Sequence, residues 1–255
     1  MDSRIDTAAR VAEIAPFHVM EVQTAARALE AQGRSVVHME IGEPDFPTPV
    51  PVIEAAQRAI ASGDIYYTSA LGIPELRRAI AAHYADAYGV EISPERVIVT
   101  AGSSAGLLLV MALLVNRDDQ ILLSDPGYPC NRHFVRVLEG VPIGVPVDSA
   151  TGYQLTADLI ERHWTPATRG VLIASPSNPT GTVVAHDEMR RIVATVGGLG
   201  GHLIMDEIYL GLTYGGRPRS VLEFSDTTFP SGGQIALWSN RIKVEVRAVR
   251  VVAVA

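Results

Sequence analysis

The chain has a single cysteine, Cys130, in 255 residues. One cysteine cannot form an internal disulfide bond, which excludes the class of small secreted domains held together by disulfides. The first twenty residues also lack the basic segment followed by an apolar segment that marks a signal peptide. These two absences predict a cytoplasmic protein.

Clustered positive charge and long apolar runs are also absent. The formal net charge is −7 and no block of lysine or arginine occurs, so the charge pattern is not that of a protein that binds nucleic acid or an acidic membrane surface. The longest apolar run, from Leu107 to Val115, is about half as long as a bilayer-spanning helix requires. We therefore predict neither a nucleic-acid partner nor a membrane partner.

The spacing of the histidines gives no sign of a metal site. They lie at positions 18, 38, 83, 133, 163, 186 and 202. These positions follow neither the H-E-x-x-H pattern nor a clustered Cys/His pattern. We interpret them as surface residues or hydrogen-bonded residues, and we predict no metal.

The chain has enough apolar residues to form a large hydrophobic core, with 47% hydrophobic and 19% charged residues. Short apolar stretches that end at Gly, Ser, Pro or Asp predict strands, and helical patterns lie between several of them. The predicted strands are Val97–Thr100, Gln120–Ser124, Pro142–Val147, Gly170–Ala174 and His202–Met205. This alternation predicts a three-layer αβα fold around a mostly parallel mixed sheet.

The N-terminal part follows a different pattern. Residues 1–33 predict a helical arm, and residues 35–41 alternate like a short strand. Amphipathic helices are predicted at Val52–Ser62 and at Pro74–Tyr88, and Gly89 is placed to end the second one. This part of the chain is therefore expected to be mainly helical.

The loops that follow the predicted strands carry the residues whose side chains could bind a ligand or take part in a reaction. In parallel α/β sheets, the loops at the carboxyl ends of the strands form the ligand crevice. The loops here are TAGSS (100–104), DPGYP (125–129), SPSNPTG (175–181) and DEIY (206–209). We expect a ligand to bind among them.

The first loop, Gly102-Ser103-Ser104, joins a strand to an apolar helix. Free N–H groups and hydroxyls at the start of a helix suit a phosphate, although most turns of this composition only begin a helix. The ring of Tyr128 suits stacking on a flat heteroaromatic group, and the amide of Asn178 is available as a donor. Taken alone, these two residues are more often a core or rim tyrosine and an ordinary turn asparagine.

Asp206 is more informative because it ends the apolar run at residues 203–205. Burial of a carboxylate there is costly unless it meets a positive partner, and a protonated pyridine nitrogen is such a partner. A metal ion and a helix N-terminus are the alternatives, but no complementary metal-ligand spacing accompanies this residue. Tyr209, which follows shortly after, brings a phenol to the same place.

Six segments, in this order, resemble the signature of the class I/II pyridoxal-phosphate (PLP) aminotransferases of fold type I, in the aspartate and alanine aminotransferase-like branch. They are GEPDFPTP (42–49), YYTSALGIPELR (66–77), TAGSSAGL (100–107), SDPGYP (124–129), SPSNPTG (175–181) and DEIY (206–209). The resemblance extends from about residue 4 to Phe229. It implies PLP as the cofactor and the transfer of an amino group from an L-amino acid to a 2-oxo acid.

The resemblance also implies a role for each residue of the cofactor site. Residues 102–104 would hold the phosphate, and Tyr128 would stack on the ring. Asn178 and Tyr209 would hydrogen-bond the ring hydroxyl oxygen, and Asp206 would keep the ring nitrogen protonated.

Two further assignments come from the N-terminal motifs. Gly42 would lie beside the substrate carboxylate. Tyr67 would reach the cofactor phosphate of a partner subunit, so the resemblance implies a homodimer.

The C-terminal part departs from the family pattern. In the family, a lysine inside a Ser-x-Ser-Lys segment forms a Schiff base with the cofactor, and no such segment follows residue 229. Lys243 is the only lysine in the chain and thus the candidate catalytic residue, the alternative being a solvated tail residue. We expect an N-terminal arm with part of the small domain at 1–46, an incomplete large domain at 47–229, a non-family tail at 230–255, and no C-terminal small domain.

This departure also affects the expected sheet. In the family, the strand that carries the lysine lies mid-sheet, and the strand after it joins it to the first strand. The Val97–Thr100 strand is therefore expected to lose its neighbours and to expose an edge. The alternating residues 244–247 offer a substitute strand.

Two other functions compete with aminotransfer. One is a different enzyme of the same fold, such as a carbon–sulfur β-lyase or a cyclopropane-forming synthase, because such enzymes share most of the cofactor motifs. The other is a non-catalytic fragment that binds the cofactor or only associates with a full-length partner. Product analysis would identify the first, and covalent trapping of the cofactor would identify the second.

Overall fold

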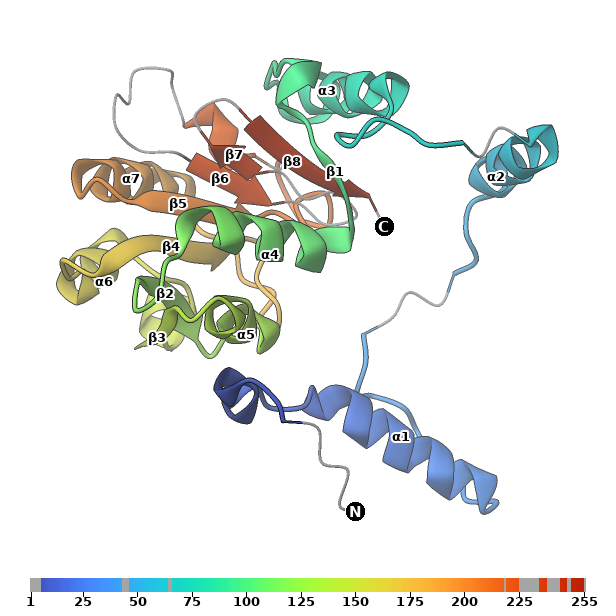
Figure 1. Cartoon of the computed structure of the whole chain (residues 1–255), viewed down its shortest axis with the longest axis horizontal. Helices are drawn as coiled ribbons and strands as arrows, with labels where there is room; N and C mark the ends of the chain where they lie inside the picture. Colours follow the sequence, from blue (N-terminus) through green and yellow to red (C-terminus); the bar gives the residue numbers. More distant parts are fainter. Residues whose placement is uncertain are drawn as a thin grey trace. The chain divides into compact units, whose positions relative to one another are not determined.

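The structure, a computed structural model, divides the chain into two compact units (Figure 1). One comprises residues 1–14 and 70–255, and the other comprises residues 15–69. The residues described are 6–42, 46–63, 66–217 and 219–224, with the backbone of strands at 234–237, 244–246 and 249–254. The domain boundaries expected at residues 46 and 229 stay predictions, because the division into compact units does not test them.

Parallel strands form the centre of the larger unit. The strand order of its main sheet is β3-β2-β4-β5-β6, and each neighbouring pair is parallel. These strands are β2 (Gln120–Asp125), β3 (Val141–Pro146), β4 (Thr168–Ala174), β5 (His202–Asp206) and β6 (Gln234–Leu237). The predicted α/β fold with a mostly parallel sheet is confirmed.

A smaller sheet joins the first strand to the end of the chain. Strand β1 (Val99–Ala101) pairs in parallel with β8 (Val249–Val254), and β8 pairs in antiparallel with β7 (Val244–Val246). The expectation that the strand at 97–100 loses its neighbours is wrong on one side, where β8 pairs with β1, but β1 still lies at the edge of this three-stranded sheet. A strand does form at Val244–Val246 (β7), but it pairs with β8, so the residues expected to substitute for the neighbour of β1 are not the ones that pair with it.

Helices connect the strands of the larger unit. They are α3 (Pro74–Tyr88), α4 (Gly102–Leu114), α5 (Cys130–Val137), α6 (Ala157–His163) and α7 (His186–Gly198). Short 3₁₀ turns lie at Ala9–Glu13, Pro94–Arg96, Ser149–Thr151 and Val221–Glu223. As predicted, α3 ends before Gly89, whose φ of +69° lies in the left-handed region that glycine adopts without strain.

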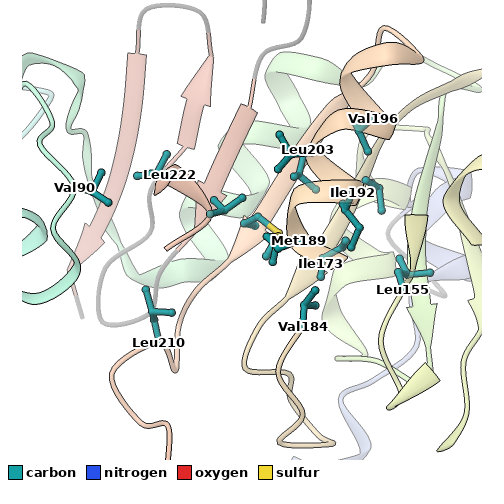
Figure 2. Packing of buried hydrophobic residues seen from close by; sticks show 14 of the residues in the cluster. Val90, Leu155, Ile173, Val184, Met189, Ile192, Val196, Leu203, Leu210 and Leu222 are labelled. Carbon is teal, nitrogen blue, oxygen red and sulfur yellow. The ribbon is translucent and has the colours of Figure 1, made fainter. Parts of the chain in front are cut away.

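Alternate residues of the central strands pack into two separate cores. In β5, Leu203 packs in the core that contains Ile192 and Val196 of α7 (Figure 2). Its neighbour Ile204 packs in the other core, with Leu107 of α4. Because successive side chains of a strand point to opposite faces, a run of apolar residues is buried between two helix layers.

Gly72 lies where the segment before α3 meets β1. Its φ is +97°, and a Cβ atom on it would lie 2.4 Å from Val99 Cγ2. The backbone N–H of Val99 also donates to Leu71 O at 3.0 Å. The residue must therefore be glycine both for its backbone conformation and for the close approach.

We expect Gly72→Ala to lower the free energy of unfolding by about 3 kcal/mol, because positive-φ strain of about 1 kcal/mol adds to overpacking of about 2 kcal/mol. Urea unfolding measures the loss. The control is Gly152→Ala, since Gly152 has a φ of +60° but no atom within 4 Å of the added Cβ, and it should lose only about 1 kcal/mol. Equal losses for the two variants would contradict a role for the contact with Val99.

The smaller unit contains α1 (His18–Ala31) and α2 (Val50–Ser62). Within these two helices Ala26 is the one buried residue, so neither helix contributes much to a core. The predicted strand at 35–41 is wrong, since those residues form no regular structure. Alternation only sorts side chains onto two faces, whereas a strand also needs a partner, and the described residues supply none here.

Candidate functional site

The loops at the carboxyl ends of the strands converge on one cavity, as predicted from their positions in the sequence. The cavity has a volume of about 80 Å³. Its lining residues are Ser103, Ser104, Leu107, Tyr128, Ala174, Asn178, Asp206, Ile208 and Tyr209. The parallel register of β4 and β5 places Ala174 beside Asp206, so both strands end at the cavity.

Asp206 is the buried charged group of this cavity. Its side chain is 6% exposed, and its Oδ1 accepts a hydrogen bond from the backbone N–H of Ile208 at 3.1 Å. Among the ion pairs of the described residues, none includes Asp206. Burial raises the pKa of Asp206 to about 7, because a low-dielectric environment disfavours the charged carboxylate. A cation in the cavity would reverse this shift.

Asn178 and Tyr209 approach each other from two different loops. The Nδ2 group of Asn178 donates to the hydroxyl oxygen of Tyr209 at 3.5 Å, which is a weak hydrogen bond. Both residues also line the cavity. An amide and a phenol are therefore available to a polar group that binds beside Asp206.

Gln154 holds the loop that carries Asn178. Its buried Nε2 donates to Ala174 O at 3.1 Å and to Thr182 O at 2.9 Å, and thereby ties the two ends of the loop together. The backbone N–H of Ser177 also donates to Thr182 O, at 2.9 Å. The sequence does not predict this role, since a single glutamine far from the loop in the chain forms no local pattern.

The helix α4 starts directly at the cavity. Its first residue, Gly102, has a φ of +77°, and Ala101 before it makes no side-chain capping hydrogen bond. The N–H groups of a first helical turn have no acceptor within the helix, and the positive end of the helix dipole favours an anion. The hydroxyl-bearing residues Ser103 and Ser104 lie in that turn.

Tyr128 forms the aromatic wall of the cavity. Its side chain is partly buried. Burial raises the pKa of the Tyr128 phenol, and the hydrogen bond with Cys130 and the neighbouring Tyr209 and Asp206 raise it further. The phenol is therefore neutral near pH 7, and its ring is available for stacking.

Gly102, the first residue of α4, is not among the lining residues of this cavity, and two further predicted site residues lie elsewhere in the chain. Gly42 and Tyr67 belong to the smaller unit and are exposed, so their roles stay predictions. Lys243 lies outside the described residues. Among the described residues, no group of three or more His, Cys, Asp or Glu side chains is arranged to hold a metal ion, and no described helix is long and apolar enough to cross a membrane.

A larger cavity, of about 430 Å³, lies between α7, β5 and the segment 210–224. Its volume exceeds that of the cavity at Asp206, but much of its lining is apolar, including Met189, Leu210 and Phe224. The smaller cavity is the better candidate because a buried carboxylate, a helix N-terminus and an amide meet there.

Sequence comparisons identify the family of the chain. The family model for "Aminotransferase class I and II" matches residues 34–238. A valine–pyruvate aminotransferase from Mycobacterium tuberculosis is 38% identical over 215 residues, which cover 84% of this chain and 55% of the relative. A (5-formylfuran-3-yl)methyl phosphate transaminase from Methanocaldococcus jannaschii is 34% identical over 217 residues, which cover 85% of this chain and 55% of the relative.

Solved structures are similar in fold. A crystal structure of an aminotransferase from Mycobacterium tuberculosis matches with a TM-score of 0.84 and 35% identity, over 93% of this chain and 60% of that chain. Aspartate aminotransferase from Thermus thermophilus with maleate matches with a TM-score of 0.83 and 30% identity, over 91% of this chain and 60% of that chain. The chain spans about half the length of the curated relatives that it matches.

Proposed function

The chain belongs to the class I and II aminotransferases, and on this premise we propose that it binds PLP and transfers an amino group from an L-amino acid to a 2-oxo acid. Members of this family use PLP. The observation that carries the proposal is Asp206, a buried carboxylate with a raised pKa and no ion-pair partner among the described residues. A protonated pyridine ring supplies the cation that this carboxylate needs.

The groups around the cavity fit the parts of PLP. Asp206 would accept the hydrogen of the pyridine nitrogen, and Asn178 and Tyr209 would be available to the ring hydroxyl oxygen. The first turn of α4, with its serines, suits the phosphate dianion. Tyr128 is available to stack on the ring.

The chemistry divides between the cofactor and the chain. When bound, PLP supplies a protonated ring that withdraws electrons from the Cα atom of the substrate. Asp206 would keep the nitrogen protonated, because a carboxylate at 6% exposure with one backbone hydrogen bond is further stabilised by a cation beside it. Lys243, the only lysine in the sequence, would be the nucleophile that attaches the cofactor and the base that moves the substrate proton.

Cofactor trapping tests the proposal. The purified chain is titrated with PLP by isothermal calorimetry, reduced with borohydride, and mapped by mass spectrometry, with Lys243→Arg as the matched control. We expect binding and a reduced adduct at Lys243 that the control lacks. Binding without an adduct would support a cofactor-binding chain without catalysis, and the absence of binding would refute the proposal.

The amino donor is tested separately. The printed names of the relatives include valine–pyruvate aminotransferase and aspartate aminotransferase, so a panel of L-amino acids is offered with pyruvate and with 2-oxoglutarate. Mass spectrometry of the products detects the new amino acid. Release of ammonia and a 2-oxo acid, or of a cyclopropane product, would favour a lyase or a synthase of the same fold.

We also propose that the chain forms a homodimer. Apolar residues of α2 are exposed, namely Val50, Val52, Ile53 and Ile60, and the Tyr67 ring is fully exposed. An apolar helix face of this kind is usual where a second protein packs. Analytical ultracentrifugation measures the mass, and Ile53→Glu with Ile60→Glu should shift a dimer to a monomer. A monomeric parent chain would contradict the proposal.

A cytoplasmic location is part of the same proposal. Cys130 is a free thiol, and reducing compartments keep thiols in that state. Fractionation of cells that express the tagged chain tests the location, and recovery from a secreted or membrane fraction would contradict it.

A further inference from the structure

A second and much smaller cavity lies directly beside the candidate site. Its volume is about 10 Å³, and it shares Tyr128, Ala174 and Asn178 with the cavity at Asp206. These shared residues form the wall between the two cavities. Ser124 and Asn131 are among the residues that line the small cavity but not the cavity at Asp206.

Within the part of the chain that the structure describes, the side chain of Asn131 has a buried hydrogen-bond acceptor without a donor beside the small cavity. It lies in the first turn of α5 and is 8% exposed. Its side-chain Oδ1 is buried and has no hydrogen-bond partner among the described residues. A buried amide oxygen without a donor is unfavourable, and native proteins usually supply such groups with protein or water partners.

We propose that the small cavity binds one water molecule and that Asn131 is, through this water, a positioning residue for Asn178. A space of about 10 Å³ for the centre of a water-sized sphere corresponds to one water molecule. Water has two hydrogens, so it donates one to Oδ1 of Asn131 and the other to Oδ1 of Asn178. The hydroxyl of Ser124, which also lines the small cavity, is available to donate to the water oxygen.

The water determines which end of the Asn178 amide faces the candidate site. When Oδ1 of Asn178 accepts from the water, its Nδ2 points to the other side of the wall, toward the Tyr209 hydroxyl 3.5 Å away. Without the water, the amide has no reason to prefer this orientation over the flipped one. The role in PLP binding rests on the proposed function, in which Nδ2 of Asn178 serves the ring hydroxyl oxygen.

Matched variants test the positioning role through PLP affinity, measured by isothermal calorimetry. Asn131→Leu has a similar shape but no acceptor, and we expect a dissociation constant about tenfold higher than that of the parent chain. Asn131→Asp keeps the acceptor and should lose less than about threefold. The control is His133→Gln, since His133 lies on the same helix with a buried Nδ1 that lacks a partner but does not line the small cavity. We expect no change in that variant.

A double-mutant cycle separates positioning from a general loss of structure. In an Asn178→Ala background, Asn131→Leu should have no further effect on the dissociation constant, because the group that it positions is gone. A tenfold loss in both backgrounds, or parent-like affinity of Asn131→Leu, would overturn the positioning role. Circular dichroism confirms that each variant is folded.

A crystal structure of the chain without PLP tests the water independently of the cofactor. We expect one ordered water within hydrogen-bonding distance of the Asn131 and Asn178 amides, and its loss in Asn131→Leu. An empty cavity in the parent chain would overturn the inference. If the parent chain does not bind PLP but the water is present, the proposed function fails while the water site stands.

Discussion

Asp206→Asn is expected to stabilise the cofactor-free protein at pH 8 by about 4 kcal/mol and to weaken PLP binding about thirtyfold or more. Burial raises the pKa of Asp206 from 3.8 to about 7 in the folded chain. Each pKa unit between the folded and unfolded states corresponds to about 1.4 kcal/mol. The ionised carboxylate thus destabilises the folded chain until a cation binds beside it.

The pH dependence of this effect has a definite sign. Between about pH 4 and pH 7, the folded Asp206 keeps a proton that the unfolded chain has released, so the stability of the parent chain falls as the pH rises. Asp206→Asn removes this contribution. The difference between variant and parent should be near zero at pH 4 and largest above pH 7, as measured by urea unfolding.

Asp119→Asn is the matched control for Asp206→Asn. Burial tends to raise the pKa of Asp119, but hydrogen bonds from Asn116 and Arg169 outweigh burial and hold the pKa below its ordinary value. Its replacement should therefore destabilise the protein at pH 8, by an amount that shrinks at acid pH. If Asp206→Asn were also destabilising at pH 8, the assignment of Asp206 as an unpaired buried acid would be wrong.

Glu207→Ala is expected to lower the free energy of unfolding by about 3 kcal/mol, although it changes the residue next to Asp206. Glu207 is 1% exposed. Its carboxylate accepts from the Ser220 hydroxyl at 2.9 Å and from the Val221 backbone N–H at 2.6 Å. Alanine leaves both buried donors without this acceptor, so the segment that starts at Ser220 should detach from β5 more easily.

Urea unfolding of Glu207→Ala beside Glu223→Ala gives the comparison. Glu223 accepts from Arg219 at 2.7 Å in a more exposed setting, so its loss should cost about 1 kcal/mol or less. Glu207→Gln keeps the shape and one acceptor oxygen and should lie between the two. Equal costs for Glu207→Ala and Glu223→Ala would contradict the anchoring role of Glu207.

The contrast between Asp206 and Glu207 shows why neighbouring acids have different roles. Asp206 lines the cavity with Tyr128 and Asn178, whereas Glu207 lines the larger cavity toward α7. Successive side chains at a strand end point to opposite faces. The two carboxylates are adjacent in the sequence, but they line different cavities and so do not form a pair of ligands for one metal ion.

Signals between neighbouring residues are enough to predict most of the fold. Gly89 ends α3 as predicted, and the apolar run before Asp206 is the buried strand β5. Helix caps and strand patterns depend on residues that are close in the chain. The order of the six sequence motifs also identifies the family. The same local reading fails at 35–41, because a strand also depends on a partner elsewhere in the chain.

The convergence of the candidate site is decided by contacts between residues far apart in the chain. Gln154 ties the loop of Asn178, Ser220 and Val221 hold Glu207, and Asn131 faces the cavity behind Asn178. None of these residues forms a local motif, because each contacts residues that are distant in the sequence and are brought close only when the sheet and helices pack. The residue types at the site are thus readable from the chain itself, whereas their pKa values, partners and orientations follow from burial and packing.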